Sequence, residues 1–273
     1  MIVPKLFFDI FKCTDFCNAV AGDTKHPCNK IINSQPTLLG QNPEPWNGNL
    51  AQAPVLIISS NPSFSPDEFY PQAKWPPKMI ADFFVNRFIR SGGSHLLQWT
   101  QDRKPLMKNG QYRERSVPYW NEMNRQMERL FGRPVQAGVD YCLTEIVHCK
   151  SQNNKGVREA APYCAKKFLT GKNAVSSANI VIGIGAFACS VLEVQGGEII
   201  NNEMDNRSVI GVPAPNSSST RKISELFNED EINNLRGQIA EHENRTHPNN
   251  FDYTKVQDVT AEERDRFIRN NLN

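Results

Sequence analysis

The sequence lacks any apolar run of about 18 residues, the length that a membrane-spanning helix needs, so no membrane span is expected. It lacks an excess of charge, because 31 basic and 29 acidic residues leave a formal net charge of +2 over 273 residues. Its N-terminal residues lack the layout and the cleavage site of a secretory signal. We therefore expect a cytoplasmic protein that contacts nucleic acid, if at all, through a local basic patch.

The sequence also lacks internal repeats, and no linker-like stretch interrupts residues 53–240. A chain of this length can bury one large core with appendages. We expect an α/β domain over residues 53–240, a helical, cysteine-bearing extension over residues 1–52, and a polar tail with a short helix over residues 241–273. We expect the protein to be a monomer.

Four short apolar segments alternate with helical segments, and they predict strands at residues 55–58, 140–147, 179–184 and 208–212. Strands that alternate with helices form βαβ units, which build a parallel sheet with helices on both faces. The predicted fold class is therefore α/β, a three-layer α/β/α sandwich around a mostly parallel, four-stranded central sheet.

Apolar residues at helical spacing predict helices at residues 6–20, 79–90, 119–131, 156–169, 186–192 and 261–270, and another from residue 222. Gly132 is expected to end the helix at residues 119–131. Residues 91–117 are polar and basic and contain Gly92 and Gly93. This segment predicts a mobile surface loop, with a solvated insertion as the alternative.

The first candidate site residue follows the strand at residues 55–58. The strand stops at Ser59-Ser60-Asn61-Pro62-Ser63, because Pro62 cannot continue a central strand and small polar residues suit a tight loop. Ligands of open α/β sheets bind at the carboxyl ends of the strands. Asn61, which offers both a donor and acceptors, is therefore presented where chemistry is expected. The alternative is an ordinary exit from a strand.

Seven cysteines in a reducing compartment are more readily explained as metal ligands or core residues than as disulfides. Cys149 and Cys164 bracket a loop and most of a helix, whereas Cys13, Cys17 and Cys28 gather near the N-terminus. In a helix over residues 6–20, Cys13 and Cys17 share one face. Two distant pairs of thiolates can close a four-ligand site, and buried unligated cysteines are the alternative.

Several segments, in order along residues 6–240, resemble the iron–sulfur uracil-DNA glycosylases. Three segments are similar to segments of that family. They are the cysteine-bearing helix at residues 6–17, the end of the second strand with its cysteine pair at residues 144–150 and Cys164, and the third strand with its glycine at residues 180–188. Asn61-Pro62 resembles the first active-site motif in the form that the mismatch-specific branch uses. Residues 212–226 are similar to the second motif of that branch.

The resemblance implies an α/β sandwich enzyme that flips a base out of DNA and hydrolyses its N-glycosidic bond. Asn61 would orient the attacking water through its side-chain carbonyl. Ser60 would contact the base, and Phe64 or another aromatic of residues 64–75 would stack on it, with core packing as the alternative for Phe64. A serine-rich run would grip the DNA backbone, namely Asn216, Ser217, Ser218, Ser219 and Arg221.

The resemblance also implies a structural [4Fe–4S] cluster near the DNA, which takes no part in base removal. Cys149 and Cys164 match the family positions. The N-terminal pair is expected to be Cys17 and Cys28, because the distance from Cys28 to the central motif suits the second ligand. Cys13 is the alternative.

Two positions depart from the family pattern. Ala214 stands where the second motif usually has a His, and His148 is a candidate to support the leaving base in its place. Glu145 stands where an Asn reads uracil, and a carboxylate accepts hydrogen bonds from an amine but repels a carbonyl. Glu145 therefore favours a cytosine-type base and, by analogy with defence enzymes of this superfamily, a modified cytosine of phage DNA. A Glu145 salt bridge is the alternative.

Other functions stay open at this stage. The chain could be a uracil or mismatch repair glycosylase, or a nucleic-acid-binding member of the fold that has lost catalysis along with the second-motif His. A zinc deaminase is disfavoured, because the sequence lacks a His-x-Glu motif paired with Cys-x-x-Cys.

Overall fold

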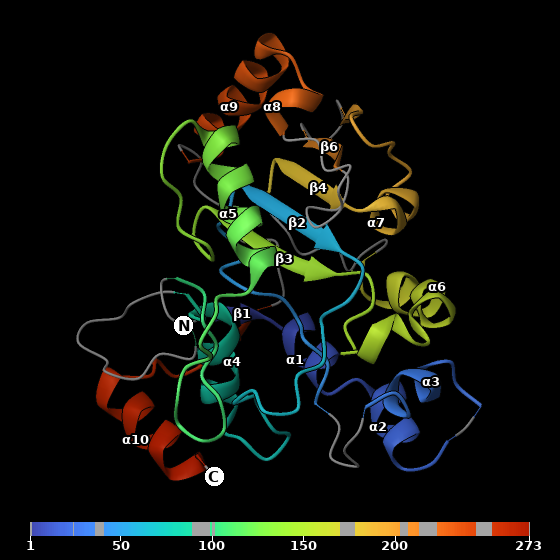
Figure 1. Ribbon diagram of the computed structural model, residues 1–273, viewed down its shortest axis with the longest axis vertical. Coiled ribbons are helices and arrows are strands. Elements are labelled where there is room, and N and C mark those ends of the chain that lie inside the picture. Colours follow the sequence, from blue (N-terminus) through green and yellow to red (C-terminus); the bar gives the residue numbers. More distant parts are fainter. Residues whose placement is uncertain are drawn as a thin grey trace.

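A five-stranded sheet lies at the centre of the computed structural model, which describes residues 2–23, 25–35, 41–88, 99, 102–169, 178–202, 207–212, 223–243 and 253–272 (Figure 1). The strand order is β3-β2-β4-β6-β5. The first four strands run parallel, and β5 pairs with β6 in the antiparallel direction. The strands are β2 (Val55–Ser59), β3 (Tyr141–Glu145), β4 (Ile180–Ile184), β5 (Ile199–Asn202) and β6 (Arg207–Val212).

The central strand β2 is buried on both faces, as its continuous apolar sequence predicts. Side chains alternate along a strand, so Val55 and Ile57 face one side of the sheet while Leu56 and Ile58 face the other. The register pairs Ser59 with Glu145, the last residue of β3. The carboxyl ends of β2 and β3 therefore lie side by side.

Helices cover both faces of the sheet. Val55 and Ile57 belong to a core that also takes in Met123, Met127 and Leu235, and its helices are α5 (Pro118–Phe131), α8 (Ile223–Leu226) and α9 (Glu229–Glu243). The other face packs against helices α1 (Leu6–Phe11), α6 (Val157–Phe168) and α7 (Ala186–Val191). The coarse α/β prediction is confirmed.

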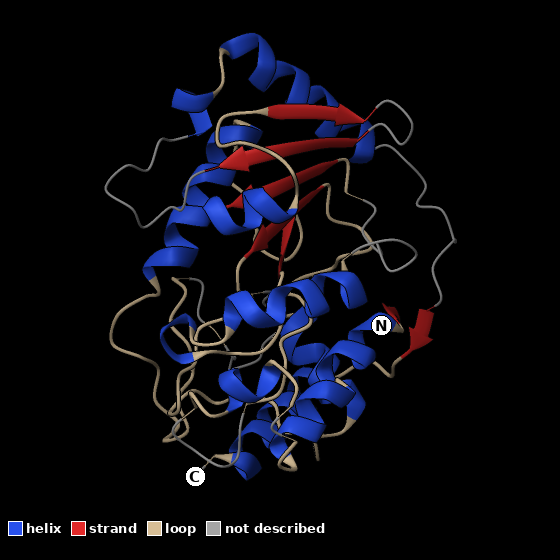
Figure 2. Ribbon diagram, turned by 90° about the vertical axis from the view of Figure 1, so that its right-hand side faces the viewer, coloured by secondary structure: helices blue, strands red, loops and turns tan. Residues whose placement is uncertain are grey.

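The two ends of the chain pack together beyond the β3 edge of the sheet (Figure 2). A two-stranded sheet joins β1 (Ile2–Pro4) to β7 (Tyr253–Lys255), and the helices here are α2 (Thr14–Val20), α3 (Cys28–Ile32), α4 (Pro77–Val85) and α10 (Ala261–Asn271). Phe7, Phe84 and Ile268 lie in one buried cluster with residues of the sheet. The N-terminal extension and the C-terminal helix therefore share the core of the central domain.

The sheet has five strands in the described residues, so the prediction of four is wrong. The missing strand, β5, is the antiparallel one, and its four residues end in two asparagines that give it no continuous apolar signal. The predicted helix at residues 6–20 is two helices, α1 and α2, with Lys12 and Cys13 between them. The helix at residues 119–131 is confirmed as α5, and Gly132 ends it with a φ of 68°.

The described part of the predicted loop at residues 91–117 is bound to the domain by backbone hydrogen bonds. Phe69 donates to the Leu106 carbonyl at 2.9 Å, and Lys108 donates to the Asp67 carbonyl at 2.8 Å. Leu106 is fully buried. Across the described ranges, every helix is too short or too polar to cross a membrane.

Candidate functional site

A cavity of about 280 Å³ lies at the carboxyl ends of β2 and β3. Two backbone hydrogen bonds hold the loops after these strands together, from the Ile146 amide to the Ser59 carbonyl at 2.9 Å and from the Val147 amide to the Ser60 carbonyl at 3.0 Å. Side chains from the ends of both strands, from the loops after them, from α5 and from the segment before it line this cavity, among them Ser59, Asn61, Arg113, Tyr119, Trp120 and Glu145. We name it the active-site cavity after the motif that Asn61 resembles.

The amide of Asn61 has a fixed orientation. Its Nδ2 donates to the Pro62 carbonyl at 3.2 Å, and its Oδ1 accepts from the Ser60 hydroxyl at 3.1 Å. An amide oxygen has two acceptor sites, so Oδ1 retains one for a water or substrate proton. Ser60 itself does not line the active-site cavity, and its position makes it a support for Asn61 rather than a contact to a base.

Glu145 is 3% exposed, and its Oε2 has no hydrogen-bond partner among the described residues. Burial, followed by the nearby charge of Glu44, raises the pKa of Glu145 well above its usual value, against the opposing effects of Arg87 and Lys150. The carboxyl group therefore favours its neutral form, which can donate one hydrogen bond as well as accept. The sequence argument assumed an ionised carboxylate, which only accepts.

A buried ion network explains why Glu145 has no cationic partner in the described part of the chain. Arg87 pairs with Glu44 at 2.8 Å and with Glu68 at 3.5 Å, and Lys150 pairs with Glu68 at 3.1 Å and with Glu44 at 3.7 Å. Burial alone would raise the pKa of Glu44, but the charges of Arg87 and Lys150 outweigh it and bring the pKa to about 2. The two cations are thus matched by two carboxylates, and Glu145 forms no salt bridge with any described residue, contrary to the predicted alternative.

Aromatic side chains form part of the cavity wall, but Phe64 is not among them. The wall contains Trp99, Tyr119 and Trp120, and the Arg87 guanidinium lies 5.0 Å from the centre of the Trp99 ring. Phe64 is half-buried outside the lining. The sequence analysis missed this wall, although an aromatic pair directly after Pro118 at the start of an amphipathic helix is a usable signal.

Four cysteines line a second, small cavity, and they are Cys13, Cys28, Cys149 and Cys164. A hydrogen bond between the Cys28 and Cys149 thiols lowers the pKa of Cys28 to about 7 and raises that of Cys149. Burial raises the pKa of Cys164 to about 12. Four convergent thiols are the donor set of iron–sulfur clusters and of structural zinc sites. The described side chains include no preassembled His, Cys, Asp or Glu metal-binding group, so the fit is one of donor chemistry and location.

Cys17 lies outside this cysteine cavity. Because the chain breaks between α1 and α2, Cys13 takes the position just before α2, with a ψ of 123°, and is buried. Cys17 lies one turn later and is exposed to solvent. The structure therefore groups the alternative ligand, Cys13, with Cys28, Cys149 and Cys164, and does not bring Cys17 to them.

His148 does not line the active-site cavity either. His148 lines both the cysteine cavity and an apolar cavity on the face of the sheet opposite the active-site cavity. The residue is 1% exposed, and its Nδ1 lies 2.8 Å from the Glu44 carbonyl oxygen. Burial lowers its pKa to about 4, so the ring is neutral near pH 7. This position gives no contact with a base next to Asn61, contrary to the expected leaving-group support.

Residues 213–222, the central part of the second motif, lie outside the described residues. This applies to Ala214 and to the expected DNA contacts, which are Asn216, Ser217, Ser218, Ser219 and Arg221.

Comparison with known proteins gives no relative: no protein-family model matches the chain, and no curated protein sequence matches it. The chemistry of the site must therefore be argued from its own residues.

Proposed function

We propose that the protein is a DNA glycosylase that receives a flipped base in the active-site cavity and hydrolyses its N-glycosidic bond. One observation carries the proposal. Asn61 and Glu145 come from the ends of adjacent strands and line the same cavity, and Glu145 brings a carboxyl oxygen that has no hydrogen-bond partner among the residues described. The sequence resemblance to glycosylases assigns these same two positions to water and to the base.

In this proposal Asn61 positions the attacking water. An amide is a poor base, so its contribution is to hold the water near the sugar carbon through the remaining acceptor site of Oδ1. Ser60 and Pro62 keep the amide from rotating. The sugar develops positive charge as the base departs, and a carbonyl dipole directed at that charge stabilises the transition state.

Glu145 would read the base. A neutral carboxylic acid offers a donor and an acceptor side by side, which matches N3 and the exocyclic amine of cytosine. It can also match N3–H and O4 of uracil by reversing the two roles. We propose a cytosine-type base, including a modified cytosine such as phage DNA carries, as the first substrate class and uracil as the second.

The cysteine cavity would hold a structural [4Fe–4S] cluster through Cys13, Cys28, Cys149 and Cys164. When bound, the cluster would tie the N-terminal segment to the loop that follows β3, and it would supply no redox step. Cys149 directly precedes Lys150 of the buried ion network, so this anchor would also support the wall behind Glu145. Iron and sulfide analysis of protein purified without oxygen distinguishes a cluster from zinc.

Incubation with oligonucleotides that carry uracil, cytosine or a bulky cytosine derivative, followed by alkali cleavage of abasic sites, tests the proposed activity. We expect excision from at least one cytosine-type substrate, and Asn61→Ala should slow it at least about a hundredfold. Asn270→Ala, on the exposed side of α10, is the matched control and should excise normally. Normal excision by Asn61→Ala would refute the assignment of Asn61.

A second function is a DNA-binding protein of the same fold without catalysis. The observation that favours it is Ala214, which stands where the glycosylases that the chain resembles have a His. Binding of an oligonucleotide with a flipped base, together with no excision from any of the three substrates, would support this function over the first.

A further inference from the structure

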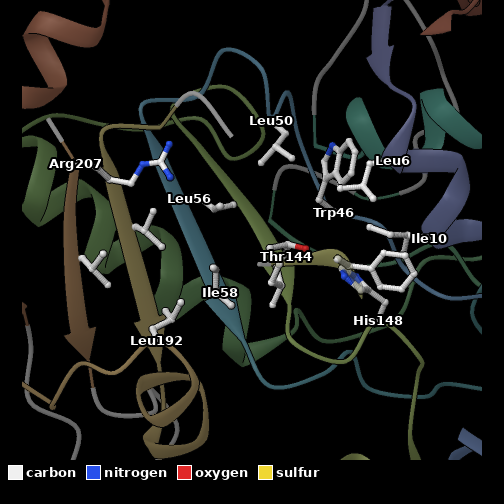
Figure 3. A pocket seen from close by; sticks show the side chains of 14 residues that line it. Leu6, Ile10, Trp46, Leu50, Leu56, Ile58, Thr144, His148, Leu192 and Arg207 are labelled. Carbon is white, nitrogen blue, oxygen red and sulfur yellow. The ribbon is translucent and has the colours of Figure 1, made fainter. Parts of the chain in front are cut away.

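The apolar cavity beside His148 has a volume of about 170 Å³ and lies on the other face of the sheet from the active-site cavity (Figure 3). Its floor consists of side chains from neighbouring strands, including Leu56 and Ile58 of β2, Val181 of β4 and Val209 of β6. Ile10 of α1 and Phe168 of α6 cover it. Because side chains alternate along each strand, this apolar slot is separated by the sheet from the active-site cavity that Ser59 and Glu145 line.

One polar atom of the residues that line this slot, Nε2 of His148, has no hydrogen-bond partner among the described residues. The Nδ1 atom of His148 is 2.8 Å from the Glu44 carbonyl, which can only accept, so Nδ1 carries the proton. With the proton on Nδ1, the Nε2 atom of this buried ring presents a lone pair, and it has no hydrogen-bond partner within the described part of the chain. In Figure 3 the ring points toward Thr144 and the slot. Thr144 does not satisfy it, because the Thr144 hydroxyl donates to the Pro45 carbonyl at 2.8 Å.

The dimensions of the slot favour a narrow molecule. Its floor extends from Thr144 of β3 across β2 and β4 to Val209 of β6, which is roughly 14 Å at the usual strand spacing of about 4.8 Å. An apolar cavity of about 150 Å³ in another protein stays dry and binds benzene, so a volume of this size suffices for a small apolar ligand. A long and thin space suits an alkyl chain better than a ring system.

We propose that the slot binds a medium-chain alkyl alcohol, whose hydroxyl group donates to His148 Nε2 while its chain lies across the sheet. An ionised carboxylate has no proton to donate to Nε2, and Arg207, the cation in this lining, lies on β6, away from His148. The inference does not depend on base excision, since its residues lie on the other face of the sheet.

Binding of linear alcohols from 1-butanol to 1-decanol to the full chain, measured by calorimetry, tests the proposal. Affinity should rise about fourfold for each methylene group and then level off once the chain fills the slot. The methyl ether of the best alcohol should bind about tenfold more weakly, because it cannot donate to Nε2. No binding, or equal binding of alcohol and ether, would overturn the inference.

Three variants locate the binding. Val209→Phe should fill the slot and abolish binding, whereas Val139→Phe, at a site that is 45% exposed and outside the slot, should bind as the wild type does. His148→Phe should keep the rise with chain length but lose the preference for alcohol over ether. Should His148→Phe fail to fold, the Val209→Phe result still decides, and wild-type binding by that variant would refute the proposal.

Discussion

At the scale of single residues, the environment of a side chain changes the chemistry that its name suggests. From the sequence alone Glu145 is expected to be an ionised carboxylate, yet burial and the neighbouring Glu44 raise its pKa and favour its neutral form. Glu44 is equally buried and is held ionised by Arg87 and Lys150. The carboxyl group that faces the cavity is thus a donor and acceptor, and the one behind it is a fixed charge.

The raised pKa of Glu145 predicts a pH-dependent effect of Glu145→Gln. A carboxyl group whose pKa is higher in the folded than in the unfolded state contributes stability at low pH, and that contribution is lost as the pH rises through the folded-state pKa. Glutamine has no such dependence. The free energy of unfolding of Glu145→Gln, relative to the wild type, should therefore increase from about pH 5 to about pH 9 in urea titrations. A constant difference across this range would show that Glu145 does not carry a raised pKa.

The same variant separates two modes of base recognition. Glutamine offers a donor and an acceptor as the neutral acid does, so Glu145→Gln should retain most of the excision of the wild-type substrate. If recognition needs an ionised carboxylate, excision by this variant should fall about tenfold or more, at the cost of roughly 1–3 kcal/mol for a mismatched contact. Initial rates at one pH measure the difference.

Arg87 is the residue on which the buried ion network depends most. Arg87→Met leaves Glu44 and Glu68 with Lys150 as their remaining cation, so we expect a loss of about 3–5 kcal/mol in the free energy of unfolding. In the wild type the lowered pKa of Glu44 gives stability above about pH 4.5 that is lost as the pH falls toward about 2. The variant should lack this acid-dependent loss. A cost below about 1 kcal/mol would mean that the network tolerates the missing charge.

At the scale of elements, the break between α1 and α2 decides which cysteine enters the cysteine cavity. A continuous helix would put Cys13 and Cys17 on one face. No Pro or Gly marks the break in the sequence, and Lys12 and Cys13 leave helical geometry inside an otherwise helical pattern. Apolar spacing alone could not predict it, because Phe11 and Phe16, on either side of the break, are both buried in one core that the local sequence does not show.

This arrangement predicts different effects for two conservative substitutions. Cys13→Ser should lower the bound iron and the brown absorbance of the proposed cluster, and Cys17→Ser should leave both unchanged. Serine is a favoured residue at the position before a helix, so Cys13→Ser should not weaken α2 itself. Iron analysis and the absorption spectrum provide the measurement. Loss of iron in Cys17→Ser, with normal iron in Cys13→Ser, would reverse the assignment.

The parallel strands and the position of Asn61 beside Glu145 were predictable, because buried strands have continuous apolar sequences and their carboxyl ends meet at one edge. The ion network was not predictable. Glu44, Arg87 and Lys150 are distant in the sequence, and they form ion pairs only because the fold buries them against one another. The strand β5 was missed because four residues with two terminal asparagines resemble a loop.

At the scale of the whole molecule, the two chain ends close the fold around α4. The β1–β7 pairing joins residues that are some 250 positions apart, and such pairing has no local signal in the sequence. Trp75 packs edge-on against Phe267 with ring centres 4.8 Å apart, and Asp82 forms a buried salt bridge with Arg264. Because Arg87 lies two residues after the end of α4, the C-terminal helix supports the segment that carries the ion network.

Two ion pairs at this interface allow a matched prediction. Arg264→Met removes the guanidinium that pairs with the carboxylate of Asp82, which is 1% exposed, and should lower the free energy of unfolding by about 3–5 kcal/mol. Lys78→Met removes the partly exposed pair with Glu263 and should cost less than about 1 kcal/mol. Urea unfolding of the two variants under one condition compares them directly. Equal costs would mean that α10 is held by its apolar contacts and that the buried pair adds no net stability to the closure of the chain ends.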